Sequence, residues 1–141
     1  MNTLSLISPA ASEAALREAA QESGLMLSPA QAHMLLVSQE KTLERLGRVD
    51  FSGGILPKLL RAFAPSLYIL AEDRAQTLAE LTESFYFFKS ETHDRLPDDD
   101  LLYAMTHLFN GKCGGSVELL NDSTADDLLS VCSEERSIYD D

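Results

Sequence analysis

The chain has 141 residues, of which 45% are hydrophobic, and it carries a formal net charge of −12 at pH 7. This length suits a single domain, and the apolar content excludes intrinsic disorder for the bulk of the chain. The negative charge repels phosphate backbones and anionic lipid surfaces, so neither a nucleic acid nor a membrane is an expected partner.

The first two helices are marked by signals at their ends. Ser12 can cap a helix from Glu13 to Ser23, and Gly24 follows as a stop. A second helix starts at Ser28-Pro29-Ala30-Gln31, which combines an N-cap serine, a proline in the first helical position and a capping box. It is expected to end near Leu46, before Gly47. Its buried side is expected to include Met34, Leu35, Val37 and Leu46.

A turn and a shorter helix follow. Charged and apolar side chains alternate from Arg48 to Phe51, which permits a short strand, although no other segment offers an evident partner. Ser52-Gly53-Gly54 then turns the chain. A third helix is expected from about Leu56 to Phe63, until the segment Ala64-Pro65-Ser66 breaks it.

The longest helix is expected from about Glu72 to Thr92. Its inward stripe consists of Leu78, Leu81, Phe85 and Phe88, which follow helical spacing. Tyr86 and Phe87 widen this stripe almost to a full circle, which predicts a helix that runs through the centre of the fold. Any part of this aromatic cluster that was exposed would instead be a docking site.

Three more helices are expected near the C-terminus. The first opens at Leu96-Pro97-Asp98, ends at Asn110-Gly111 and turns inward the side chains of Leu101, Leu102, Met105, Leu108 and Phe109. A short turn is expected from Ser116 to Leu120, and a last helix, capped by Ser123, should run to about Cys132. The inward residues of this last helix are Leu128, Leu129 and Cys132.

These elements predict an all-α fold, an irregular or orthogonal bundle of about five to seven helices with a central aromatic-rich helix. Residues 1–141 form one helical domain, in which residues 1–11 and 133–141 are expected to be loose. The N-terminus lacks the basic start and long apolar run of a signal peptide. We therefore expect a cytoplasmic protein with reduced thiols.

Few residues suggest chemistry. No Glu-x-x-His pair of a di-iron bundle occurs, and Glu91 and His93 point to different faces of a helix, so neither a metal nor another cofactor is expected. Cys113 precedes two glycines and a helix N-terminus, which can make a thiol reactive, and His107 is a candidate base. The alternative for Cys113 is a small buried residue in a tight turn, and no catalytic residue is assigned.

Basic residues are concentrated in one part of the chain. Of the eleven lysines and arginines, five lie in residues 41–61, namely Lys41, Arg45, Arg48, Lys58 and Arg61. Backbone N–H groups where a Gly-Gly turn meets a helix can hold phosphate or carboxylate. The pattern predicts an anion site formed by Arg48, Gly53, Gly54, Lys58 and Arg61. The alternative is a turn whose neighbouring cations pair with the many carboxylates, and no P-loop or GxGxxG motif is present.

Three blocks of residues carry a resemblance to a known family. They are Gly47-Arg48-Val49-Asp50-Phe51 with Gly53-Gly54, the stretch from Glu83 to Thr92, and the stretch from Phe109 to Leu120. Over about residues 26–120 the chain resembles a family of small, uncharacterised bacterial proteins known only as a domain of unknown function. The resemblance implies a bacterial cytosolic setting and assigns no activity, ligand or catalytic residue.

Two functions from different classes follow from these observations. The favoured one is a non-catalytic module of the bacterial cytosol that binds another protein, through a helical groove or through its acidic C-terminal segment. The alternative is a small-molecule or anion-binding protein, or an enzyme, that uses the stretch from Arg48 to Arg61 or Cys113. The oligomeric state is left open by the sequence.

Overall fold

The computed structural model describes residues 9–49 and 55–140, and the side chains within residues 13–49 and 55–133. Over these residues the chain forms seven α-helices, one short 3-10 helix and no strand, so the predicted all-α fold is confirmed. In chain order the elements are α1 (Pro9–Glu22), α2 (Pro29–Leu46), α3 (Leu56–Phe63), η1 (Ala71–Asp73), α4 (Arg74–Glu91), α5 (Asp98–Asn110), α6 (Val117–Asn121) and α7 (Ala125–Asp140).

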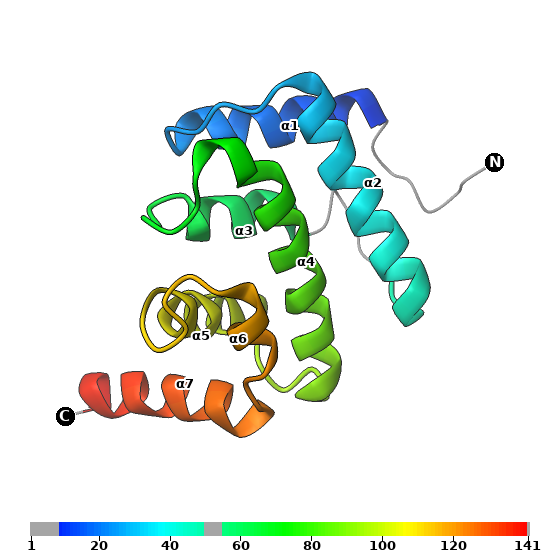
Figure 1. Cartoon of the computed structure of the whole chain (residues 1–141). Coiled ribbons are helices and arrows are strands. Elements are labelled where there is room, and N and C mark those ends of the chain that lie inside the picture. Colours follow the sequence, from blue (N-terminus) through cyan, green and yellow to red (C-terminus); the bar gives the residue numbers. More distant parts are fainter. Residues whose placement is uncertain (1–8, 50–54, 141) are drawn as a thin grey trace.

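Helix α4 holds the fold together. It runs through the middle of the molecule with α2 alongside it, while α1 and α7 lie towards opposite ends (Figure 1). Helices α2, α3, α5 and α6 all contact α4. One continuous apolar core results, to which every α-helix contributes at least one buried side chain.

The local signals of α2 act as the sequence predicts. The Ser28 hydroxyl accepts a hydrogen bond from the Gln31 N–H at 3.1 Å, and the Ser28 N–H donates to Gln31 Oε1 at 2.9 Å. Gly47 ends the helix in the left-handed conformation, with a φ of 67°. These two ends fix the length of α2 independently of what packs against it.

The buried side of α2 differs from the expected one. Its buried residues are Ala32, Leu35, Gln39 and Thr42, whereas Met34, Val37 and Leu46 are only half-buried. The two polar members are tolerated because they are hydrogen-bonded. Thr42 Oγ1 donates to the Ser38 carbonyl oxygen at 3.0 Å, and the Tyr86 hydroxyl donates to Gln39 Oε1 at 3.4 Å. Neither contact can be deduced from apolar periodicity.

The inward stripe of α4 is confirmed, because Leu78, Leu81, Phe85 and Phe88 are all buried. Tyr86 is buried as well, but the side chain of Phe87 is 42% exposed. The expectation that α4 is apolar and buried around nearly its full circumference is therefore wrong on the side of Phe87. No neighbouring helix covers that side completely.

The ends of several helices also differ from expectation. Helix α4 starts at Arg74, after the separate 3-10 turn, and α1 starts at Pro9 rather than Glu13. Helix α7 continues to Asp140 instead of ending near Cys132. Whether residues 1–11 and 133–141 are loose stays a prediction. The residues expected to turn the chain, 52–54, lie outside the described residues, as do Asp50 and Phe51.

Helix α7 is capped one residue later than expected, by Thr124 instead of Ser123. The Thr124 N–H donates to Asp127 Oδ2 at 2.8 Å, and the Asp127 N–H donates to Thr124 Oγ1 at 3.1 Å. The hydrogen bond from the Thr124 backbone holds the pKa of the Asp127 carboxyl below its ordinary value.

None of the described helices is both long enough and apolar enough to cross a membrane.

Candidate functional site

An open groove with a volume of about 540 Å³ lies where α2, α4 and α6 meet. We call it the α4 groove, and it is lined by Arg45 and Leu46 of α2, by Glu80, Glu83, Ser84 and Phe87 of α4, and by Val117, Glu118 and Asn121 of α6. Its volume lies within the range of about 300–1,000 Å³ that is typical of ligand-binding clefts. Residues that are far apart in the sequence therefore form one concave surface.

One face of α4 forms a wall of this groove. Glu80, Glu83, Ser84 and Phe87 stand at positions i, i+3, i+4 and i+7, which lie on one side of an α-helix. The core stripe of the same helix has the same spacing and includes Leu81, Phe85 and Phe88, each one residue later. The two faces are adjacent, and α4 thus separates the apolar core from the groove.

The apolar part of the groove centres on Phe87. Its ring packs edge-on against the buried ring of Phe88, with the two centroids 5.5 Å apart. This contact restricts the orientation of the Phe87 ring. Leu46 and Val117 contribute two half-buried aliphatic side chains. A partly solvent-exposed aromatic ring in a concave surface is a feature of docking sites.

The polar part of the groove is acidic, because three glutamates and one arginine leave a net charge of −2 on its lining. Arg45 Nη2 lies 3.2 Å from Glu83 Oε1, and Gln76 Nε2 donates to Glu80 Oε2 at 2.9 Å. Glu118 has no hydrogen bond or ion pair from its side chain to another described residue. The groove therefore presents negative charge beside an apolar surface.

A hydrogen-bonded contact fixes α6 against α4 at the edge of the groove. Ser84 is buried, and its Oγ lies 3.1 Å from the Glu80 carbonyl oxygen and within hydrogen-bonding range of Asn121 Oδ1. The Ser116 hydroxyl caps the first turn of α6 by accepting from the Leu119 N–H at 3.1 Å. The position of Glu118 at the rim thus follows from a capped helix that is tied to α4.

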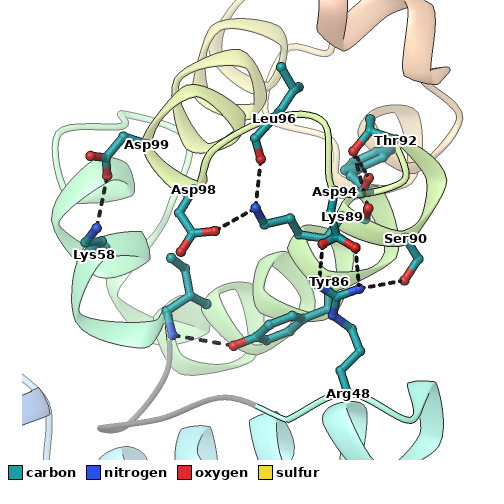
Figure 2. A network of polar contacts seen from close by, with 12 residues as sticks. Arg48, Lys58, Tyr86, Lys89, Ser90, Thr92, Asp94, Leu96, Asp98 and Asp99 are labelled. Carbon is teal, nitrogen blue, oxygen red and sulfur yellow. Dashed lines mark hydrogen bonds and ion pairs between the residues drawn. The ribbon is translucent and has the colours of Figure 1, made fainter.

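The cations of the predicted anion site are paired with carboxylates from other parts of the chain. Arg48 Nη2 lies 2.6 Å from Asp94 Oδ1, and Arg48 Nη1 donates to Ser90 Oγ at 3.4 Å (Figure 2). The hydrogen bond from Arg48 is the main cause that holds the pKa of the Asp94 carboxyl below its ordinary value. Asp94 itself adopts a positive φ of 58°, directly after His93 with a φ of 54°.

Lys58 and Arg61 have separate partners. Lys58 Nζ lies 3.4 Å from Asp99 Oδ1, which joins α3 to α5 (Figure 2), and Arg61 Nη2 lies 3.1 Å from Glu22 Oε2, which joins α3 to α1. The observed pairs match the alternative of cations that neutralise carboxylates. Gly53 and Gly54 lie outside the described residues, and the anion site stays a prediction.

Lys89, near the end of α4, is a nearly buried cation. Its side chain is 12% exposed, and its Nζ donates to the Leu96 carbonyl oxygen at 2.7 Å and lies 2.8 Å from Asp98 Oδ1 (Figure 2). These contacts tie the end of α4 to the start of α5.

Among the described residues, no three His, Cys, Asp or Glu side chains gather in a way that would hold a metal ion.

Cys113 is buried in the turn between α5 and α6, and its backbone N–H donates to the Leu108 carbonyl oxygen at 2.9 Å. Burial raises the pKa of the Cys113 thiol, and this effect outweighs the opposing hydrogen bond with Ser123. His107, the candidate base, is exposed on α5, where its ring lies 6.0 Å from that of Tyr103. Both observations favour the interpretation of Cys113 as a packing residue.

We predict that Cys113 reacts slowly with thiol reagents in the folded protein, because the thiolate is the reactive form and burial disfavours it. In a Cys132→Ala variant, which reports Cys113 alone, modification by a chromogenic disulfide at pH 8 should be at least about 100-fold slower than that of free glutathione. The same variant in concentrated urea should react at the rate of glutathione. A fast reaction of the folded variant would show that the thiol is activated.

The fold and the site define an all-α protein with an acidic groove that has an apolar centre. The model of DUF6323, a family of unknown function, matches residues 14–137, and the chain therefore belongs to this family. The match is wider than the resemblance expected over residues 26–120, because it includes most of the first helix and of the acidic last helix. Comparisons with curated proteins and with solved structures gave no match.

Proposed function

We propose that the protein is a non-catalytic interaction module of the bacterial cytosol, and that its α4 groove binds a basic segment of another protein. The observation that supports this proposal is the combination, in one groove, of the exposed ring of Phe87 with an acidic lining. The bound segment would insert an apolar side chain beside Phe87 and place lysines or arginines against Glu80, Glu83 and Glu118.

The apolar centre would provide most of the affinity. Aromatic side chains at the middle of a concave surface are the usual binding hot spots, because they lose all contact with water when a partner docks. Leu46 and Val117 flank Phe87 from two other helices, so an inserted side chain would be contacted from three directions. This geometry suits an amphipathic helix whose apolar residues repeat every three or four positions.

The acidic lining would provide selectivity for a basic partner. The net charge of −2 on the lining has the same sign as the net charge of −12 on the whole chain, so the long-range field and the local field act together. Such a field speeds the encounter with cations and weakens with added salt. An acidic partner would be repelled both at a distance and in the groove.

The test is the binding of a synthetic amphipathic peptide of about 15 residues, with leucines on one helical face and lysines and arginines elsewhere. We expect saturable binding that weakens with salt, and no binding of the counterpart peptide in which glutamates replace the basic residues. Phe87→Ser should weaken binding at least about tenfold, because it removes the apolar anchor. Glu80→Gln combined with Glu118→Gln should weaken it by about three- to tenfold.

Two matched variants distinguish binding in the α4 groove from non-specific binding of the peptide elsewhere on the surface. Leu67→Ser removes an exposed apolar side chain outside the groove, where Leu67 is 93% exposed. Glu72→Gln removes an exposed carboxylate from η1, also outside the groove. Both should bind the peptide within about twofold of the unaltered protein. If Leu67→Ser weakens binding as much as Phe87→Ser does, the α4 groove is not the binding site.

A further inference from the structure

Arg45 is the only cation among the described residues that line the α4 groove. It lies in the last turn of α2, and its guanidinium reaches across to α4, where Nη2 is 3.2 Å from Glu83 Oε1. Both side chains are more than half exposed, with values of 58% for Arg45 and 56% for Glu83. In the free protein, Arg45 thus already forms an ion pair with Glu83, one of the three carboxylates of the groove.

From this geometry we infer that Arg45 is an internal competitor for the groove, which a basic side chain of the partner displaces from Glu83. The inference rests on the function proposed above and adds a means of regulating the same site. A partner's guanidinium or ammonium group would take over the contact with Glu83. Arg45 would turn away while the partner's apolar side chain covers Phe87.

The displaced Arg45 has another favourable position. The last turn of a helix carries the negative end of the helix dipole, and Arg45 belongs to the last turn of α2. An ion pair with this much exposure is weak and exchanges readily. Displacement therefore needs only a modest gain from the partner, but a lone cation without an apolar anchor gains too little by replacing Arg45.

The experiment compares Arg45→Gln with Lys41→Gln in binding of the same leucine- and lysine-rich peptide. Each variant removes one positive charge from α2, but Lys41 is exposed, does not line the groove and forms no ion pair with another described residue. Arg45→Gln should tighten binding by about three- to tenfold, because it frees Glu83 for the peptide. Lys41→Gln should change binding by less than about twofold.

A second comparison tests whether Glu83 carries the effect. When Glu83 is already replaced by Gln, adding Arg45→Gln should no longer tighten the binding of the peptide. If the double variant keeps the gain, Arg45 acts only through overall charge, and the inference is overturned. If Arg45→Gln binds more weakly than the unaltered protein, Arg45 is a contact for the partner, and the inference is overturned while the proposed function stands. Failure of the unaltered protein and of Arg45→Gln to bind the peptide would overturn both.

Discussion

Replacing Phe88 by alanine should lower the free energy of unfolding by about 3–5 kcal/mol, which is the usual effect of removing a buried phenylalanine. The Phe88 side chain is 0% exposed and belongs to the stripe that α4 turns into the core. Because single domains unfold with only about 5–15 kcal/mol, this variant should lose a large share of its stability. Urea unfolding followed by circular dichroism measures the change.

The neighbouring residue provides the control. Phe87→Ala removes the same atoms from the same helix, but Phe87 is 42% exposed on the side of the groove. It should lower the free energy of unfolding by only about 1–2 kcal/mol, because a large part of the ring is already solvent-exposed and no closed cavity forms. Equal effects of the two substitutions would mean that the assignment of core face and groove face on α4 is wrong.

The second large effect is expected for Gly115→Ala, in the turn between α5 and α6. Gly115 has a φ of +83°, and a Cβ atom placed there would lie 2.4 Å from Cβ and Cγ of Tyr68. Rotation of the tyrosine side chain cannot move its own Cβ, so the backbone must shift. Left-handed strain of about 1–2 kcal/mol and crowding of about 1–3 kcal/mol should together lower stability by about 2–5 kcal/mol.

Gly114 and Tyr68 allow the two contributions to be separated. Gly114 also has a positive φ, of +57°, but nothing lies within 4 Å of an added Cβ, so Gly114→Ala should show only the strain of about 1–2 kcal/mol. In a Tyr68→Gly background, which removes the Cβ and the ring together, Gly115→Ala should be milder than in the unaltered protein. Thermal unfolding measures all four variants. A Gly115→Ala effect no larger than that of Gly114→Ala would contradict the packing of Tyr68 on Gly115.

The sequence predicts helices well where their ends are signalled locally. Helix α2 begins and ends as expected because Ser28 and Gly47 act through hydrogen bonds within a few residues. Helices α3 and α5 also have the expected bounds. At α7 two overlapping signals compete, because Ser123 and Thr124 are each followed three residues later by an aspartate. Local rules do not rank these two caps, and the structure uses Thr124.

The groove is harder to predict, because it depends on which side of α4 its neighbours leave uncovered. Arg45 and Glu83 meet only after α2 has packed along α4, and α6 adds Glu118 from a third part of the chain. One signal was present in the sequence. Phe87 follows Glu80 and Glu83 by seven and four residues, and an aromatic on the same helical face as two carboxylates is not surrounded by core.

Because three helices form the α4 groove, a ligand bound there should stabilise the protein against unfolding. The walls of the groove come from residues 45–46, 80–87 and 117–121, so an occupant that contacts all three bridges helices from three separate parts of the chain. Loosening any one of these helices would then release the occupant. A ligand present at 100 times its Kd would add about 2.7 kcal/mol to the free energy of unfolding. A rise in melting temperature thus becomes a way to screen for natural partners before any of them is known.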